Sequence, residues 1–549
     1  MEVILKRGER SSRLSSRVAM NTRVRVQYLQ TNFAIAIAIA IMLSCVHATQ
    51  ADIDGGYAAL TARLGDAAPT GAGIAAVQIE GPQTAGGSNF TPDLLAPEFA
   101  GKNITIVNSP ATSSWHATNV AMWLYGLNTS MAKGMNSVWV YNVNTWITGT
   151  LNVGMGTTLP AVAPSTLVRV MNHSWIGSFG VGQEGYDREA IRRMDYQMTR
   201  DGIVCVCGEN NGAGSTRAPM MGDNFNGLSV GRFDLEHSAG DTGSASDTPG
   251  RMKPDMIASG QFTSFSTPVV GSAAALLCET LQSNASTASL SKAQKAQLAK
   301  IALLAGADRD QSWANNAAQT GASRGMATKP WDVLRGSGSL NVNRAHRIVT
   351  AERVNGASNA ATATQCASEG WGTGTLSTNE KTSWRFLITR PAANFDFTIT
   401  WPRVVATNLA SYTLANMNLR MQGTLDGAAS LFALEGDAGI GIFLAGNVAS
   451  ASAVDNVETI HLLNLQPGEY VVEMSRSDAA AGSVVAYAAW SADATAFGLL
   501  GDLDGSGVVD FGDVVFALLS FGSDDPLADL DHSGVVDFGD IVLILLNFG

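Results

Sequence analysis

The chain has 549 residues, of which 46% are hydrophobic and 15% are charged, and its formal net charge is −12. This length leaves room for roughly three or four domains, and the apolar content is sufficient for folded cores. The excess of acidic residues repels phosphate groups, so we expect neither nucleic acid nor an anionic lipid surface as a partner.

Residues 1–51 have the pattern of a secretory signal. Seven basic residues precede an apolar run, Phe33–Val46, and small residues follow near Ala48 and Ala51, where cleavage is expected. The run is shorter than the ~20 residues that span a bilayer, which disfavours a retained membrane anchor. Cys45 would allow a lipoprotein anchor, but Met42-Leu43-Ser44 fits that signal poorly. We expect a secreted or cell-surface protein, of bacterial extracellular or periplasmic type, whose mature chain has no membrane span and a net charge of −17.

Short apolar runs alternate with helical patterns between Gly71 and about Ala345. The runs that we predict as buried strands are Ile74–Ile79, Ile104–Val107, Val138–Val143, Leu167–Met171 and Ile203–Cys207. The predicted helices are Asn119–Tyr125, Arg188–Arg200, Pro268–Leu281 and Lys292–Leu304. This alternation predicts an α/β domain with a mostly parallel sheet and helices on both faces, in which ligands gather at the carboxyl ends of the strands.

Four cysteines remain after the signal. Cys205 and Cys207 alternate with valines in a predicted strand, so we expect them to be small buried hydrophobes rather than a redox pair. Whether Cys278 and Cys366 form a disulfide is left open by the sequence.

The region from about Gln365 to Ala492 has a different pattern. Runs with the alternation of strands are separated by turn residues such as Gln466-Pro467-Gly468. The runs are Ser383–Ile388, Phe395–Thr400, Thr459–Leu462 and Glu469–Met474. This pattern predicts a β-sandwich, which serves either to stabilise the first domain or to bind a ligand.

A serine stands where a loop leads into an apolar helix of small residues, in the segment Thr263-Ser264-Phe265-Ser266-Thr267-Pro268. The free N–H groups and the dipole of a helix N-terminus favour negative charge, which suits a hydroxyl that attacks a carbonyl and leaves an oxyanion. The segment resembles the nucleophile motif of subtilisin-like serine proteases (subtilases, peptidase S8 family), Gly-Thr-Ser-Met-Ala-Thr-Pro. The resemblance implies that Ser264 is the nucleophile, although Phe262 stands where glycine is usual.

Two further segments resemble the other triad motifs of this family. Trp115–Ala121 is similar to His-Gly-Thr-His-Val-Ala-Gly, which implies that His116 is the general base. Gly71–Gly81 is similar to the family's strand that ends in Ile-Asp-Thr-Gly, which implies that Glu80 orients the histidine. Here glutamate replaces the usual aspartate, so its backbone must lie further from the imidazole.

The resemblance also implies an oxyanion donor and a specificity pocket. Ile203–Gly212 resembles the family's apolar strand followed by Ala-Gly-Asn-x-Gly, which makes Asn210 the side-chain donor beside the Ser264 backbone N–H; Glu209 stands where glycine is usual. Arg251–Gly260 resembles the strand Lys-Pro-Asp-Ile-x-Ala-Pro-Gly that precedes the nucleophile. A strand end similar to Asn-x-Ser-x-Gly implies four substrate-binding residues, which are Ser174, Trp175, Ile176 and Gly177.

The last fifty residues contain a repeat with a period of 27, in which each copy carries a twelve-residue acidic loop. Oxygen-bearing residues at positions 1, 3, 5, 9 and 12, a glycine at position 6 and a backbone carbonyl at position 7 are the pattern of a calcium loop. The predicted ligands of two calcium ions are Asp502, Asp504, Ser506, Val508, Asp510 and Asp513 in the first copy, and Asp529, Asp531, Ser533, Val535, Asp537 and Asp540 in the second. The duplication and the aspartate at position 12 resemble a type I dockerin, which implies a possible cohesin-like protein partner.

These patterns predict four parts: a signal peptide (1–51), a subtilase-like catalytic domain (52–350), a jelly-roll-like β-sandwich (351–495) and a small α-helical, dockerin-like calcium module (496–549). The expected function is that of a secreted serine endopeptidase that cleaves polypeptides without a cofactor for the chemistry. The alternative is a weakly active or inactive scaffold of the same fold. Glu80, Glu209, Phe262 and the short stretch 52–70, which leaves little room for an inhibitory pro-region, favour that alternative.

Overall fold

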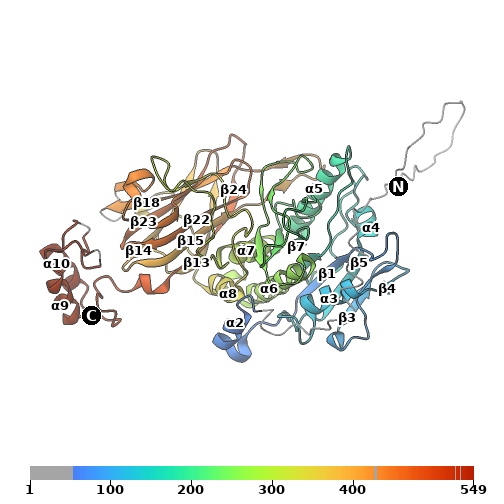
Figure 1. Ribbon diagram of the computed structural model, residues 1–549, viewed down its shortest axis with the longest axis horizontal. Helices are drawn as coiled ribbons and strands as arrows, with labels where there is room; N and C mark the ends of the chain where they lie inside the picture. Colours follow the sequence, from blue (N-terminus) through green and yellow to red (C-terminus); the bar gives the residue numbers. More distant parts are fainter. Residues whose placement is uncertain (1–53, 426–429, 526, 532) are drawn as a thin grey trace, which may run out of the picture.

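The computed structural model describes residues 54–425, 430–525, 527–531 and 533–549. The parallel sheet, the two antiparallel sheets and the C-terminal helix pair follow one another along the long axis of the molecule (Figure 1). The expected signal peptide lies outside the described residues. Within the described ranges, no helix combines the length and apolar character needed to cross a bilayer.

A seven-stranded sheet forms the centre of the first domain, in the order β11-β8-β7-β6-β1-β5-β3. All of its strand pairs are parallel, which confirms the predicted α/β class. The strands are β1 (Ala75–Glu80), β3 (Asn103–Ile106), β5 (Ser137–Asn142), β6 (Val168–His173), β7 (Val204–Gly208), β8 (Leu228–Arg232) and β11 (Met256–Ala258). Two small ladders accompany it, formed by β2 (Asn89–Thr91) with β4 (Thr112–Ser113) and by β9 (Gly240–Asp241) with β10 (Met252–Lys253).

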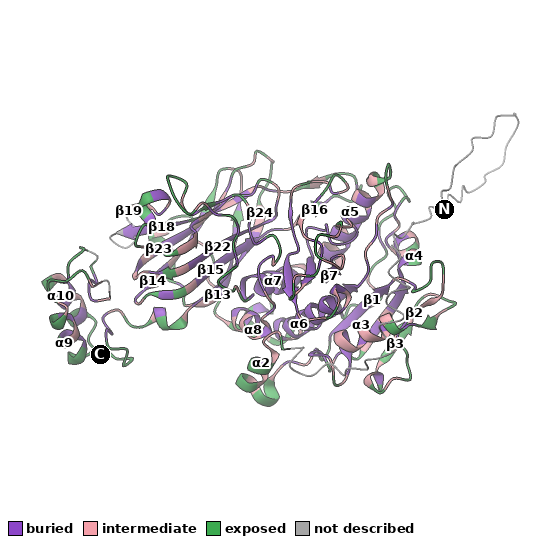
Figure 2. Cartoon of the chain, in the orientation of Figure 1, coloured by how far each residue is buried: buried purple, intermediate pink, exposed green. Residues whose placement is uncertain are grey.

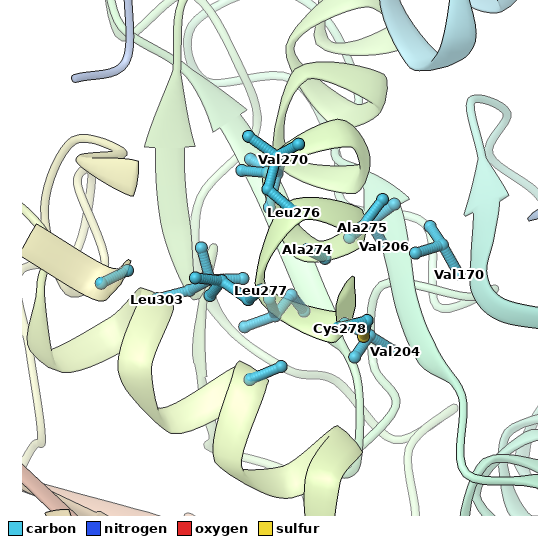
Figure 3. Packing of buried hydrophobic residues seen from close by; sticks show 14 of the residues in the cluster. Val170, Val204, Val206, Val270, Ala274, Ala275, Leu276, Leu277, Cys278 and Leu303 are labelled. Carbon is cyan, nitrogen blue, oxygen red and sulfur yellow. The ribbon is translucent and has the colours of Figure 1, made fainter. Parts of the chain in front are cut away.

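Helices cover both faces of this sheet, as predicted. On one face, α3 (Trp115–Tyr125), α6 (Thr263–Ser283), α7 (Lys292–Ala305) and α8 (Val342–Thr350) share one apolar cluster with the strands (Figure 3). On the other face, α5 (Glu184–Asp201) and α4 (Val143–Thr145) pack in a second cluster. The short α2 (Tyr57–Leu64) contributes Leu60 to the first cluster.

The side chains of β1 alternate between these two clusters, as the pleat of a strand requires. Ala75, Val77 and Ile79 face the cluster with α5, whereas Ala76 belongs to the cluster with α3 and α6. The same alternation directs Glu80 toward α3. Gly271 of α6 is needed here, because an added Cβ would lie 2.8 Å from a methyl group of Leu124 on α3. The two helices therefore pack closely.

The four described cysteines are buried free thiols. Cys205 and Cys207 lie in β7 and belong to the apolar cluster, as expected for small hydrophobes. Burial raises the pKa of Cys205 well above its usual value, and it raises the pKa of Cys278 and of Cys366 to about 12. Cys278 and Cys366, whose pairing the sequence left open, do not form a disulfide.

Two antiparallel sheets form the second region, and many residues of their strands are buried (Figure 2). The sheets enclose a dense apolar core that includes Trp384, Phe386 and Trp490. The first sheet has β12 (Met326–Ala327), β21 (Ala449–Ser450), β18 (Met417–Leu425), β23 (Gly468–Arg476) and β14 (Lys381–Ile388), with β19 (Ser430–Ala433) beside β18. The second has β13 (Glu369–Leu376), β24 (Val484–Ala492), β15 (Ala392–Thr400), β22 (Val457–Leu465) and β20 (Ala445–Asn447), and β16 (Val404–Val405) pairs with β17 (Tyr412–Thr413). Only the pairing of β12 with β21 is parallel in the first sheet, so a segment before residue 350 completes a sheet of the second region.

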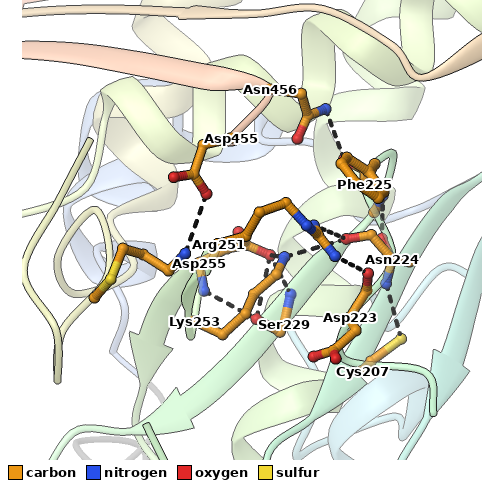
Figure 4. Close-up of polar contacts among 12 residues, drawn as sticks. Cys207, Asp223, Asn224, Phe225, Ser229, Arg251, Lys253, Asp255, Asp455 and Asn456 are labelled. Carbon is orange, nitrogen blue, oxygen red and sulfur yellow. Dashed lines mark hydrogen bonds and ion pairs between the residues drawn. The ribbon is translucent and has the colours of Figure 1, made fainter. Parts of the chain in front are cut away.

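The two regions share a core and a polar interface. Trp371, Tyr487 and Ala489 of the second sheet belong to the same apolar cluster as α7 and α8. Nearby, Asp455 accepts a hydrogen bond from the Met252 N–H at 3.1 Å, and Asn456 donates to the Phe225 carbonyl at 2.9 Å (Figure 4). The second region is therefore packed into the first rather than tethered to it.

The C-terminal repeat forms a small helical unit. Each copy consists of an acidic loop followed by a helix, α9 (Phe511–Leu519) or α10 (Phe538–Leu546), and the two helices pack around Val514 and Ile544. Asp510 and Asp537 cap the two helices, each with a capping box. The guanidinium of Arg390, which follows β14, lies 3.4 Å from the Asp502 carboxylate at the start of the first loop.

Candidate active site

Glu80 and His116 form a hydrogen-bonded pair at the carboxyl end of β1. The Glu80 Oε2 atom lies 2.9 Å from His116 Nδ1, and the Glu80 side chain is completely buried. Gln78 donates its Nε2–H to Glu80 Oε1 at 2.9 Å, and the Tyr125 hydroxyl holds the Gln78 amide in turn at 2.8 Å. The carboxylate is thus fixed at both oxygens, which in a histidine pair holds one tautomer and one ring orientation.

His116 is the second residue of α3. The helix begins there because Ser114 caps it, accepting from the Ala117 N–H at 2.9 Å. The His116 side chain is 25% exposed, so the ring is anchored through Nδ1 and keeps a solvent-facing edge.

Ser264 is the second residue of α6. Its hydroxyl donates to the Ser174 carbonyl at a long 3.4 Å, and the Ser174 hydroxyl donates to the Ser264 carbonyl at 2.8 Å. Pro268 explains the second contact, because a proline four residues on has no N–H to offer that carbonyl. The contact of the Phe265 ring with the His116 ring, at a centroid distance of 6.1 Å, places the two helix N-termini side by side.

The turn after β7 presents two asparagines with different environments. The Asn210 Nδ2–H donates to the Thr216 carbonyl at 3.0 Å. The Asn211 Oδ1 atom accepts from the Thr263 N–H at 2.9 Å, directly beside Ser264. The structure thus brings the side chain of Asn211 to Thr263, the residue before Ser264, and engages the predicted Asn210 elsewhere.

Glu209 is buried in an ion cluster beneath this turn. Its Oε1 lies 2.8 Å from Arg217 Nη2 and its Oε2 lies 3.2 Å from Arg217 Nε, while the Ser238 hydroxyl donates to Oε2 at 3.0 Å. Arg217 also lies 2.9 Å from Asp223. Burial raises the pKa of Asp223, and the two carboxylates raise the pKa of Arg217 against the opposing effect of its own burial.

The four predicted substrate-binding residues occupy different places after β6. Ser174 contacts Ser264 as described, whereas Trp175 is buried and donates its indole N–H to His173 Nδ1 at 3.1 Å. Gly177 pairs with the backbone of Met220, and an added Cβ would lie 3.1 Å from the Met220 methyl group. Ile176, between them, is partly exposed.

Three aromatic rings border the site. Phe262 packs on Phe265 at a centroid distance of 5.6 Å, and Phe265 packs on Trp115 at 5.7 Å. Phe262 thus lies in an aromatic cluster that includes Phe265, the residue after Ser264. Trp115 is 44% exposed, so this cluster has a surface that an apolar group can reach.

Three carboxylates meet in each loop of the C-terminal repeat. The carboxylate oxygens of Asp502, Asp504 and Asp513 lie within 4.8 Å of one another, and so do those of Asp529, Asp531 and Asp540. The Ser506 hydroxyl donates to the Val508 carbonyl, and the Ser533 hydroxyl donates to the Val535 carbonyl, both at 3.0 Å. An all-oxygen set with this carboxylate density fits a hard divalent cation such as calcium.

Comparisons with known proteins gave structural similarities only. No family model and no curated protein matches the chain. Among solved structures, it is similar to a protease of Pseudoalteromonas arctica (14% identity, 54% of this chain and 93% of that chain, TM-score 0.31). It is also similar to a cold-adapted subtilisin-like serine proteinase (20%, 44% and 86%, TM-score 0.27) and to fervidolysin of Fervidobacterium pennivorans, a keratinolytic enzyme related to subtilisin (13%, 68% and 64%, TM-score 0.34). All three TM-scores are low, so these similarities alone assign no function to the chain.

Proposed function

We propose that the protein is a secreted, subtilase-like serine endopeptidase. The observation that carries this proposal is the 2.9 Å contact of buried Glu80 with His116 Nδ1, on a helix whose N-terminus lies beside that of the Ser264 helix. A carboxylate, an imidazole and a hydroxyl supplied by separate elements are the components of acyl transfer through a serine.

In this mechanism Glu80 accepts the His116 Nδ1–H, which leaves His116 Nε2 free to act as a base. The Nε2 atom takes the Ser264 hydroxyl proton as the Oγ atom attacks the peptide carbonyl, and it then gives this proton to the leaving amine. Water repeats the sequence on the acyl-enzyme. The Ser264 hydroxyl must rotate away from the Ser174 carbonyl to reach the imidazole, and its 3.4 Å hydrogen bond there is weak enough to break easily.

We assign the side-chain oxyanion donor to Asn211 in place of Asn210. The Asn211 carboxamide, held through Oδ1 by the Thr263 N–H, leaves its Nδ2–H group as a donor beside Ser264. The Ser264 backbone N–H, at the start of α6, is the second donor. A strand-end Asn-Asn pair gives no means of choosing between the two residues from the sequence alone.

We further propose that the C-terminal repeat binds two calcium ions, one held by the Asp502 loop and one by the Asp529 loop. Each ion would neutralise carboxylates that otherwise repel one another and would fix the loop against its helix. The outer sides of α9 and α10 expose large apolar residues, with Leu519 84% and Leu546 75% exposed. This surface is consistent with tethering to a cohesin-like protein.

A fluorophosphonate probe tests the proposed hydrolase directly. The purified, calcium-loaded protein should be labelled, and Ser264→Ala and His116→Ala should each abolish labelling. Ser266→Ala, on the same helix but buried, is the matched control and should still be labelled. A folded wild-type protein that takes up no probe would overturn the proposal and favour the scaffold alternative, with which the hydrogen bond of Ser264 to Ser174 is also consistent.

A further inference from the structure

We propose that Arg217 is a positioning residue of the active site, which holds the oxyanion turn in place and cancels the charge of Glu209. This inference rests on the proposed serine-protease function. Glu209 stands where the family pattern has glycine, and the inference explains how the chain accommodates its charge, through the pairing with Arg217.

Arg217 and Glu209 form a buried, bidentate ion pair. Arg217 reaches both Glu209 oxygens, at 2.8 and 3.2 Å, and the Glu209 and Arg217 side chains are only 1% and 10% exposed. Fork-to-fork pairs of this kind fix orientation as well as charge. Loss of the arginine would leave the buried carboxylate of Glu209 without a cation, which is strongly unfavourable. Asp223, the other carboxylate that Arg217 contacts, would still have Arg251 and Lys253 near it.

A chain of hydrogen bonds links this pair to the nucleophile. Ser238 donates its hydroxyl to Glu209 and accepts the Asn210 N–H at 3.0 Å, so the turn is held to the carboxylate. The Glu209 carbonyl accepts the Thr263 hydroxyl at 2.7 Å, and Asn211 binds the Thr263 N–H. Displacement of Glu209 would therefore shift both the proposed donor Asn211 and the residue that precedes Ser264.

The charge of Glu209 gives a second reason why the active site needs Arg217. The reaction builds negative charge at the carbonyl oxygen, beside the turn that carries Glu209, and an uncompensated carboxylate there would oppose it. By the same Coulomb argument, that carboxylate would favour the protonated form of the His116 imidazole and would so weaken the general base at low pH. Arg217 prevents both effects without touching substrate.

Steady-state kinetics across pH on five variants test this inference. The variants are Arg217→Met, Arg217→Lys, Glu209→Gln, the double variant E209Q/R217M, and the control Arg232→Met, which removes an arginine paired with the half-exposed Asp234. We expect R217M to lower kcat about 10- to 100-fold with little change in KM, and to move the low-pH limb of kcat/KM to higher pH. R217K should recover part of kcat, because a lysine restores the charge but not the fork.

The double variant separates positioning from general stability. E209Q/R217M should recover most of the kcat lost in R217M and return the pH limb to its wild-type place, whereas R232M should resemble wild type. A purely structural role of Arg217 would lower the thermal midpoint without moving the pH limb, and the double variant would be no better than R217M; either result overturns the inference. If wild type is labelled by the fluorophosphonate and R217M is labelled at the same rate, the inference fails while the protease stands. If wild type is not labelled, both the proposed protease function and the inference about Arg217 are wrong.

Discussion

Arg403 of the second region reaches Asp195 on α5 of the first, with a distance of 2.7 Å between Nε and Oδ2, and both side chains are completely buried. Asp247 lies on the other side of the same guanidinium, and the ring of Phe225 lies 4.2 Å below it. The pair joins a loop of the β-sheet region to the helix that covers the second face of the parallel sheet. It ties together parts of the chain more than two hundred residues apart.

Removal of one partner of this pair should destabilise the whole molecule. In Arg403→Met the buried carboxylate of Asp195 loses its cation, whereas Asp247 keeps its ion pair with Arg192, and we expect a loss of about 3–5 kcal/mol in the free energy of unfolding. Urea denaturation followed by tryptophan fluorescence measures this loss. Arg420→Met, which removes a 46% exposed arginine from its pair with Glu435, is the control and should change stability by less than about 1 kcal/mol. Equal stabilities of the two variants would contradict the role of Arg403.

The charge of Glu80 should be needed for turnover rather than for folding of the site. Glu80→Gln keeps the side-chain size but removes the anion that stabilises the imidazolium, and we expect kcat to fall by roughly 10³- to 10⁴-fold. Glu80→Asp withdraws the carboxylate from His116 by one methylene, so its kcat should lie between that of E80Q and that of wild type. Kinetics with a peptide substrate, with thermal midpoints as a check on folding, give the comparison. An E80Q variant with wild-type kcat would exclude Glu80 from the triad.

Calcium should stabilise the C-terminal unit without acting at Ser264. Titration calorimetry of the chelator-treated protein should find two sites, and Asp513→Asn or Asp540→Asn should each remove one of them. Chelation should lower the unfolding temperature of α9 and α10, because three carboxylates then face one another in each loop. The fluorophosphonate labelling rate should stay the same. Absence of bound calcium after dialysis against the free ion would refute this assignment.

Stability should depend on pH through Asp455 at the interface between the two regions. Burial raises the pKa of Asp455 from its ordinary value to about 6 in the folded protein. The folded state therefore holds a proton that the unfolded state releases, so stability is greatest below about pH 4 and falls as the pH rises through 6. This contribution is on the order of 3 kcal/mol.

Asp455→Asn removes this term, since the amide does not titrate and its oxygen can still accept the Met252 N–H. The free energy of unfolding of wild type minus that of D455N should decrease between pH 4 and pH 7. A difference that stays constant over this range would show that Asp455 does not titrate as described.

The elements of the first domain could be predicted because their apolar residues recur with the spacing of a strand or of a helix. The predicted strand Ile74–Ile79 and helix Lys292–Leu304 differ from β1 and α7 by only one residue at a boundary. The Glu80–His116 contact is the one that the resemblance of two segments to the triad motifs implies. The two residues lie at the end of a strand and near the start of a helix, where the backbone direction leaves little freedom to the side chain.

Contacts made by turns and loops could not be predicted in the same way. Asn210 and Asn211 lie just beyond β7, where the alternation of a strand no longer tells which side chain faces α6. Arg217 lies in an irregular loop without a regular pattern of apolar residues, so no feature of the sequence indicated its contact with Glu209. The pairing of β12 with β21 depends on two residues more than one hundred and twenty positions from their partners. Gln78 did carry a signal, as a polar residue inside an otherwise apolar strand.

The apolar cluster that α7 and α8 share with Tyr487 and Ala489 has a consequence for the order in which the protein matures. The helices leave the ribosome well before the strand that covers them, so part of their apolar surface stays exposed to water until nearly the whole polypeptide has been made. Completion of this core therefore waits for the last strand of the second region, so the first domain should not reach its full stability as a separate fragment.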